Sequence, residues 1–176
     1  EVVNVVKLKL YDNKITEVEK PEILIAGCGT GQHSISTAAR FKSSKVLAID
    51  LSLSSLAYAK RKTKELDIEN IEYKQADILD LGGLNKQFDI IESAGVLHHM
   101  DNPMAGWKVL TDCLKPGGLM SIGLYSELAR TPIVMLREEI RKLEIGTSIS
   151  EIKSFRDMIL SSDKDHYKQI FSFLAK

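Results

Sequence analysis

The feature that most constrains this chain is a short apolar run that ends in three alternate glycines. The run Ile23–Ala26 has the length and composition of a buried strand, and Gly27, Gly29 and Gly31 follow it. A segment with helical spacing begins near Gln32. Because glycine has no side chain, a loop of this kind between a strand and a helix brings bare backbone close to a ligand. The sequence therefore predicts a ligand-binding turn at these glycines.

Strand-like and helix-like segments alternate after this loop. This alternation is typical of an α/β fold with a doubly wound, mostly parallel sheet and helices on both faces. The segments between the strands carry apolar residues at helical spacing, which are Leu56, Ala59, Thr63 and Leu66, and then Met104, Trp107, Leu110 and Leu114. The strands that we expect are Ile23–Ala26, Lys45–Ile49, Ile71–Gln75, Phe88–Ser93 and Leu119–Leu124.

Two patterns shape the second half of the chain. The Lys-Pro-Gly-Gly sequence at 115–118 predicts a turn that ends the preceding helix and leads into the fifth strand. After Ser126 the spacing is wholly helical, and Ile152, Phe155 and Ile159 mark one amphipathic face. No further strand signal follows, so we expect the chain to end on helices.

The predicted domain organisation has three parts. Residues 1–20 form a leading strand or a linker, and residues 21–126 form the ligand-binding core. Residues 127–176 form a helical extension, for which a lid and a docking segment are the two interpretations. The chain begins with Glu1, and flanking domains of a longer chain stay open at this point.

Composition narrows the class of partner. Lys plus Arg and Asp plus Glu both number 24, so the net charge is zero, and a basic stretch at 60–64 is interpreted as a solvated helix face. No apolar run approaches the roughly 20 residues of a membrane span. We therefore expect neither a nucleic-acid partner nor a membrane. Cys28 and Cys113 lack the spacing of metal ligands, so we expect no metal site and a reducing, cytoplasmic location.

The spacing of the glycines discriminates between nucleotide ligands. A Walker loop needs a lysine and a serine or threonine after its last glycine, and Gln32 and His33 stand there instead. The dinucleotide fingerprint needs its third glycine three places after the second, which is the place of Gln32. This spacing disfavours NAD without excluding it.

Carboxylates follow the second and third predicted strands. Asp50 ends the second strand, where it can accept hydrogen bonds from two ribose hydroxyls; an N-cap for a helix starting near Ser52 is its structural alternative. Asp77 and Ile78 follow the third strand, and a carboxylate beside an apolar residue fits the edge and face of an adenine ring. The sequence therefore predicts an adenosine that lies across consecutive strand ends.

Five motifs in this order resemble the class I S-adenosylmethionine-dependent methyltransferases. They are Ala-Gly-Cys-Gly-Thr-Gly at 26–31, Ala-Ile-Asp-Leu-Ser at 48–52, Gln-Ala-Asp-Ile at 75–78, Phe-Asp-Ile-Ile at 88–91 with Val-Leu-His-His-Met at 96–100, and Leu-Lys-Pro-Gly-Gly at 114–118. The likeness covers about Glu22–Tyr125. The sequence Leu-Tyr-Ser-Glu-Leu-Ala-Arg at 124–130 is also similar to a bacterial methyltransferase-like domain often attached to tetratricopeptide repeats.

The resemblance implies S-adenosyl-L-methionine as cofactor and methyl transfer to an unidentified acceptor, more a small molecule than nucleic acid. It also implies a cofactor site made by residues of four loops, which are Ala26, Gly27, Cys28, Gly29, Gly31, Asp50, Leu51, Asp77, Ile78, Ser93, Ala94 and Gly95. The alternative is a catalytically idle module that holds the cofactor, or only its fold, inside a larger assembly.

Two departures from the family favour that alternative. Many members carry an acid two residues before the first glycine, where it helps to bind the methionine amino group, and here Ile25 occupies that place. The family's sheet usually ends with a sixth strand and an antiparallel seventh, and this chain has no signal for either.

Candidate catalytic residues follow the fourth and fifth strands. A hydroxyl or acidic-carbon acceptor needs a base, and histidine is the side chain most often used as one. His98 and His99 are therefore candidates, with His99 preferred; packing or a backbone hydrogen bond is their alternative. Tyr125 and Glu127 are candidates for binding the acceptor. We interpret Cys28 as a small packing residue.

Overall fold

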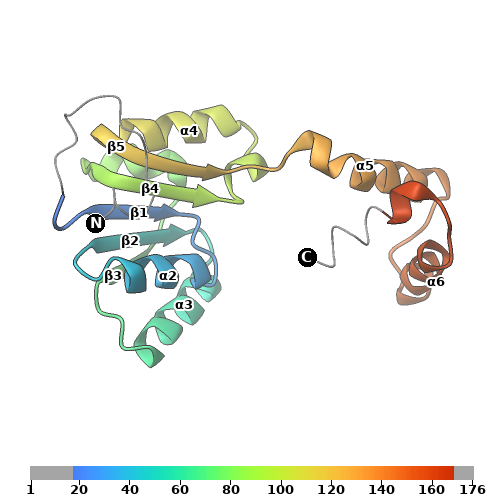
Figure 1. The fold of residues 1–176 in the computed structure, drawn as a ribbon, viewed down its shortest axis with the longest axis horizontal. Helices are drawn as coiled ribbons and strands as arrows, with labels where there is room; N and C mark the ends of the chain where they lie inside the picture. Colours follow the sequence, from blue (N-terminus) through green and yellow to red (C-terminus); the bar gives the residue numbers. More distant parts are fainter. Residues whose placement is uncertain (1–17, 169–176) are drawn as a thin grey trace. The chain divides into compact units, whose positions relative to one another are not determined.

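The structure is a computed structural model of the 176-residue chain, and it describes residues 18–168. The chain divides into two units, Glu1–Leu124 and Tyr125–Lys176. The first unit contains the sheet and the second contains helices (Figure 1). The predicted leading strand or linker at 1–20 lies outside the described residues except for its last three.

The first unit is built on a five-stranded sheet in which every pair of neighbours is parallel. The strand order is β3-β2-β1-β4-β5. This arrangement confirms the predicted doubly wound α/β fold. The chain runs outward from β1 to β3 and then returns to β4 on the other side of β1, which makes the carboxyl end of β1 the point where such sheets bind ligands. The strands are β1 (Glu22–Ala26), β2 (Lys45–Asp50), β3 (Ile71–Gln75), β4 (Phe88–Ala94) and β5 (Leu114–Gly123).

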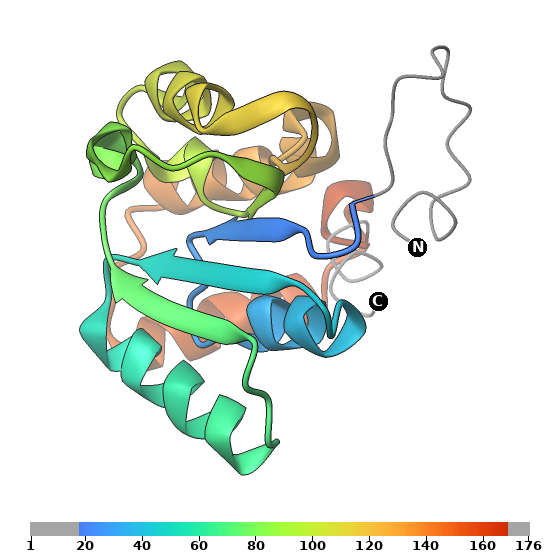
Figure 2. The same cartoon turned by 90° about the vertical axis from the view of Figure 1, so that its left-hand side faces the viewer.

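Helices cover both faces of this sheet (Figure 2). Successive strand residues point to opposite faces. Ile23 and Ile25 accordingly pack with the helices that follow β1 and β2, whereas Leu24 packs with Leu110 and the 3₁₀ turns. The helical elements of this unit are α2 (Gln32–Arg40), α3 (Leu53–Glu65), the 3₁₀ turns η1 (Ile78–Leu84) and η2 (Leu97–His99), and α4 (Pro103–Asp112).

The predicted apolar faces of α3 and α4 are correct in the middle of each helix and wrong at some ends. Leu56, Ala59, Thr63 and Leu110 are buried, and Trp107 packs against the core. Leu66 lies one residue beyond α3 and is 58% exposed, and Met104 in the first turn of α4 is 67% exposed. Leu114 is not helical, because it is the first residue of β5.

The predicted turn at 115–118 is a bulge inside the strand pairing instead of a loop before it. Leu114 pairs with Phe88 and Leu119 pairs with Ile90, so four residues of β5 lie opposite Asp89 alone. The expected strand start at Leu119 is therefore five residues late. The strand is paired both before and after an insertion of this kind. A turn signal in the sequence does not show whether the strand has already begun before the turn.

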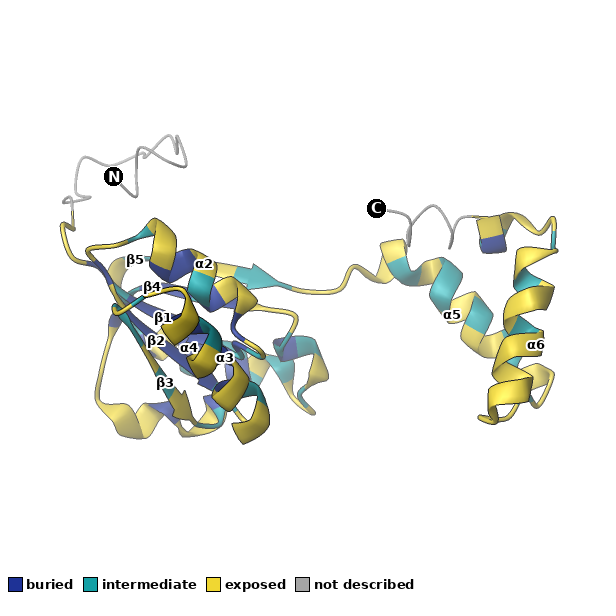
Figure 3. Ribbon diagram, turned by 90° about the horizontal axis from the view of Figure 1, so that it is seen from below, coloured by how far each residue is buried: buried dark blue, intermediate teal, exposed yellow. Residues whose placement is uncertain are grey.

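The second unit contains α5 (Glu127–Lys142) and α6 (Ile149–Leu160), and no strand follows β5 among residues 18–168. This confirms the helical C-terminal segment. Neither helix has a fully buried residue (Figure 3). The expected apolar face of α6 is wrong at Ile152, which is 55% exposed, while Phe155 and Ile159 are half-buried.

Candidate functional site

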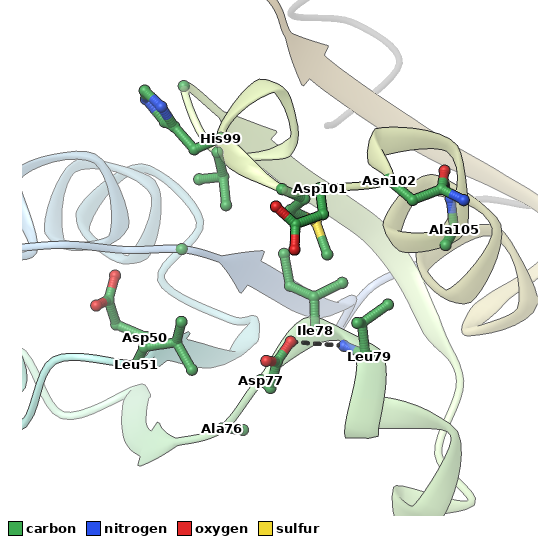
Figure 4. A pocket seen from close by; sticks show the side chains of 14 residues that line it. Asp50, Leu51, Ala76, Asp77, Ile78, Leu79, His99, Asp101, Asn102 and Ala105 are labelled. Atoms are coloured by element: carbon green, nitrogen blue, oxygen red, sulfur yellow. Dashed lines mark hydrogen bonds between the residues drawn. The ribbon is translucent and has the colours of Figure 1, made fainter.

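A cavity of 560 Å³ lies at the carboxyl ends of the central strands, where the strand order reverses. Its walls come from the loops after β1, β2, β3 and β4 and from the start of α4 (Figure 4). We call it the main cavity. It is lined by Gly27, Asp50, Leu51, Ala76, Asp77, Ile78, Leu79, Gly95, Val96, His99, Met100, Asp101, Asn102 and Ala105.

The glycine loop is held against the end of β2 by backbone hydrogen bonds. The N–H groups of Gly27 and Cys28 both donate to the carbonyl oxygen of Ile49, each at 2.9 Å. Gly27 has a φ of +79°, and a Cβ at this position would lie 2.2 Å from a Val96 methyl carbon. Only glycine fits here, so bare backbone forms this part of the main cavity's wall.

Asp50 is positioned by two backbone donors. Its Oδ2 accepts a hydrogen bond from the Gly29 N–H at 2.7 Å, and its Oδ1 accepts from the Ser52 N–H at 2.9 Å. The N-cap of α3 is Ser52, so the alternative role of Asp50 as that N-cap is wrong. A carboxylate has about four acceptor sites, so Asp50 retains acceptor capacity for ligand hydroxyls in the main cavity.

Asp77 and Ile78 form the wall that faces Asp50 across the main cavity (Figure 4). Asp77 Oδ1 accepts from the Leu79 N–H at 2.9 Å and so caps η1. Its Oδ2 has no hydrogen bond within the described residues. Ile78 is 6% exposed and supplies an apolar surface beside that carboxylate.

A second cavity, of 510 Å³, lies around the glycine loop, and we call it the loop cavity. It shares Gly27 with the main cavity. α2 begins at its edge with no side-chain cap and no acidic residue in the first turn, so the N-terminal amides of α2 are open to an anion. The loop cavity is lined by Gly27, Cys28, Gly29, Thr30, Gln32, His33, Ser36 and Ala94.

The twelve predicted cofactor residues divide between the cavities and the core. Nine of them line one or both cavities. Gly31 instead packs on α3, because a Cβ there would lie 2.6 Å from the Ala59 Cβ. Ala26 and Ser93 are 0% and 1% exposed within the sheet. The cofactor roles of these three residues stay predictions, and the structure shows a packing environment for each.

The two histidines differ in position. His99 lines the main cavity, with its ring at the upper margin of the group drawn in Figure 4, whereas His98 is half-buried and lines neither cavity. Their Nε2 atoms are 3.1 Å apart, so one ring donates a hydrogen bond and the other accepts it. The catalytic role of either histidine stays a prediction.

Tyr125 and Glu127 belong to the second unit, whereas the two cavities are formed by residues of the first. The Arg130 guanidinium lies 4.0 Å from the centre of the Tyr125 ring, and Glu127 is in the first turn of α5. Their proposed contact with an acceptor stays a prediction.

Two cavity-lining segments escaped the sequence reasoning. Val96, Met100 and Asp101 belong to the stretch between β4 and α4, and His33 lies in the first turn of α2. Position after the end of β4 is the sequence signal that could have indicated the first of these two segments. In Figure 4 the Asp101 carboxylate faces the side of the main cavity formed by Ile78.

The chemistry of Cys28 agrees with a packing role. Burial raises the pKa of its thiol to about 11, helped by the nearby Asp50 charge. The thiol therefore stays protonated and is a poor nucleophile. Within the described ranges no three histidine, cysteine or acidic side chains gather as metal ligands do, and no helix is long and apolar enough to cross a membrane.

Comparison with known proteins identifies the family. A family model described as a methyltransferase domain matches residues 23–118, more than half of the chain. An uncharacterized protein from Synechococcus is 35% identical over 129 residues, which are 73% of this chain and 31% of that protein. A ubiquinone biosynthesis O-methyltransferase from Acinetobacter baumannii is 27% identical over 74% of this chain and 53% of its own length.

A solved structure supports the fold. PKMT2 from Rickettsia typhi, in complex with AdoHcy, has a TM-score of 0.69 at 24% identity, over 82% of this chain and 28% of that protein. The chain thus spans about a third to a half of the length of the relatives that it matches.

The residues present fit the cofactor that this family uses. The main cavity offers carboxylates and an apolar wall to a nucleoside, and the loop cavity offers helix amides to a charged tail. Gly27 lines both cavities. The narrower likeness to tetratricopeptide-linked domains stays a prediction. This chain belongs to the methyltransferase-domain family, whose methyl donor is S-adenosylmethionine.

Proposed function

We propose that this domain transfers a methyl group from S-adenosylmethionine to a small-molecule acceptor. The observation that carries the proposal is the junction of the two cavities at Gly27, with Asp50 and Asp77 in the lining of the main cavity. This arrangement suits an elongated zwitterionic nucleoside and leaves the space beside His99 for an acceptor.

Asp50 and Asp77 have separate roles in this proposal. The Asp50 oxygens, each already bonded to one backbone N–H, accept the ribose hydroxyls with their remaining lone pairs. Asp77 Oδ2 accepts a hydrogen bond from the adenine amino group, and Ile78 packs against the ring face. Hydrogen bonds to a charged group contribute about 1.5–3 kcal/mol each, so Asp50 supplies much of the specificity for a ribonucleoside.

The chain's contribution to the reaction is mainly alignment. The bound cofactor supplies an activated methyl group on a sulfonium, so the protein has to bring an acceptor into line with it. The bare backbone at Gly27 and the small residue Gly95 keep the junction accessible. If the acceptor is a hydroxyl, a ring nitrogen of His99 takes its proton.

A small molecule suits this domain better than a nucleic acid. The net charge is zero, and the main cavity is lined by three carboxylates, Asp50, Asp77 and Asp101, which repel phosphate. The Acinetobacter relative is named for O-methylation in ubiquinone biosynthesis, which is the hydroxyl chemistry considered for His99. Two buried free thiols, Cys28 and Cys113, support the proposed cytoplasmic location.

A thermal-shift comparison of S-adenosylmethionine, S-adenosylhomocysteine and NAD tests the cofactor. A ligand that binds only the native state raises the melting temperature, and we expect this for the two adenosyl sulfur ligands alone. Stabilisation by NAD only would contradict the proposal. Asp50→Ala should lower the affinity for S-adenosylhomocysteine about 10- to 100-fold, because the ribose loses its charged acceptor. Asp112→Ala is a matched control at an exposed position in α4.

A second candidate is a binding module within a longer protein. The chain spans 31% and 53% of the length of its two relatives, and Ile25 occupies the place of the family's acid. Transfer of a labelled methyl group from the cofactor to small molecules of a cell extract separates the two candidates. Measurable cofactor binding without any transfer would favour the module.

A further inference from the structure

An acidic side chain lies next to the place of the missing acid, on the neighbouring strand. Glu92 of β4 pairs directly with Ile25 of β1 in the parallel register. Its side chain is 18% exposed. The carboxylate oxygen Oε2 accepts a hydrogen bond from Thr37 Oγ1 at 2.9 Å and lies 2.8 Å from His33 Nε2. Both partners belong to α2, so Glu92 points to the face of the sheet that α2 covers.

The charge of Glu92 is incompletely compensated. Within the part of the chain that the structure describes, its other oxygen, Oε1, has no hydrogen bond, and no lysine or arginine pairs with it. Among the described residues its ionic partner is His33, whose ring is charged only when protonated. Withdrawing a carboxylate from water is costly unless it is paired and hydrogen-bonded. A partly buried carboxylate with one unpaired oxygen is suited to receive a cation from a ligand.

The loop cavity needs an acid of this kind. Its lining side chains carry no negative charge, and it lies beside the amides that begin α2. An amino-acid tail bound there would place its carboxylate at those amides and would still need an acceptor for its ammonium group. His33 lines the loop cavity and contacts Glu92, so the carboxylate lies one side chain behind the cavity wall. Asp50 lines the main cavity and not the loop cavity, and its two oxygens already accept hydrogen bonds from the N–H groups of Gly29 and Ser52.

We propose that Glu92 binds the ammonium group of the cofactor's methionine tail and so replaces, from β4, the acid that Ile25 does not supply on β1. Oε1 accepts from the ammonium while Oε2 keeps its bonds to Thr37 and His33. The exposed His33 ring moves aside to admit the tail. This inference rests on the proposed cofactor binding and assigns a binding residue to it.

Calorimetric titration with three ligands tests the assignment. The ligands are S-adenosylhomocysteine, its deaminated analogue, which lacks only the ammonium group, and 5′-methylthioadenosine, which lacks the whole tail. The wild-type domain should bind S-adenosylhomocysteine roughly 10- to 100-fold more tightly than the deaminated analogue, since one charged hydrogen bond separates the two. Glu92→Gln should abolish this preference and leave the affinity for 5′-methylthioadenosine unchanged.

Two control variants separate binding from structure. Thr37→Val removes a hydrogen bond from Oε2 and keeps the charge, so the preference should survive. Asp50→Ala should lower the affinity for all three ligands alike, because all three carry the ribose.

Three results would overturn the inference. The first is a Glu92→Gln protein that keeps the full preference for the ligand with the ammonium group. The second is a Glu92→Gln protein whose affinity falls equally for all three ligands, which indicates a structural role only. A wild-type preference below about threefold would also overturn it, whether or not the variant folds. If no ligand binds the wild-type domain, the proposed function fails together with the role of Glu92. If the ligands bind but Glu92→Gln has no selective effect, only the role of Glu92 fails.

Discussion

The two units of this chain differ in how they are held together. In the first unit both faces of the sheet are covered, and Ile23, Leu24 and Ile91 are 0% exposed. In the second unit α5 and α6 have no fully buried residue (Figure 3). Its one fully buried large side chain among the described residues is Tyr167, whose hydroxyl donates to Glu139.

This difference shows where a precise site is built. Both cavities lie in the first unit, on loops anchored to fully buried strands. Close packing holds such loops within the narrow tolerance that binding requires. Among the described residues of the second unit, exposed apolar side chains such as Leu128 and Ile149 remain on the helices. The same substitution should therefore have very different effects in the two units.

The largest expected effect comes from replacing an isoleucine by alanine at one position in each unit. Ile91→Ala should lower the free energy of unfolding by about 2–5 kcal/mol, because it leaves a cavity in a fully buried layer. Ile152→Ala, at a 55% exposed position, should change it by less than about 0.5 kcal/mol. Urea unfolding is followed by the fluorescence of Trp107, the one tryptophan, for the first unit and by far-ultraviolet circular dichroism for the helices of the second. Similar losses of unfolding free energy for both variants would contradict the proposed difference in packing between the two units.

Ligand binding should sharpen the contrast further. S-adenosylhomocysteine at 100 times its dissociation constant should stabilise the first unit by about 2.7 kcal/mol. Hydrogen exchange should slow at the glycine loop and around Asp50 and Asp77, and it should stay unchanged in α5 and α6. Protection of α5 or α6 would instead support the interpretation of residues 127–176 as a lid.

A smaller effect is expected at the third glycine of the loop. Gly31→Ala should destabilise the first unit by about 1–3 kcal/mol, because the new methyl group meets Ala59 and the backbone has a φ of +89°. Gly82→Ala is the matched control, since a Cβ there meets no atom within 4 Å. Urea unfolding compares the two. An equal loss of unfolding free energy at both positions would show that a glycine at position 31 is not needed for packing on α3.

The smallest expected effect is a pH dependence of the second unit. The hydrogen bond from Tyr167, followed by one from Lys164, lowers the pKa of Glu139 from 4.5 to about 2, against the opposing effect of burial. A lowered carboxyl pKa contributes stability that is complete above about pH 4.5 and is lost as the pH falls toward 2. Helix content measured by circular dichroism should therefore decrease over that range. Glu139→Gln should remove the dependence; an unchanged titration in that variant would assign it to other carboxylates.

Local sequence was sufficient for much of the fold and for one side of the site. The apolar run before Gly27 predicted β1, and the carboxylates that end or follow β2 and β3 predicted residues of the main cavity, because parallel strands end at one edge of a sheet. The bulge at 115–118 was not predictable in the same way. A proline and two glycines indicate a turn, but whether strand pairing continues beyond them depends on the partner strand.

The sequence by itself determined the strand–glycine–helix order, the parallel α/β class and the chemistry available at the strand ends. These follow from short-range periodicity and from the backbone freedom of glycine, which act within a few residues. Only the tertiary structure decided that Gly31 packs on Ala59 and that Glu92 lies opposite Ile25 with His33 beside it. Those neighbours are 28, 67 and 59 positions apart along the chain. Their proximity depends on strand register and helix packing, which no local pattern encodes.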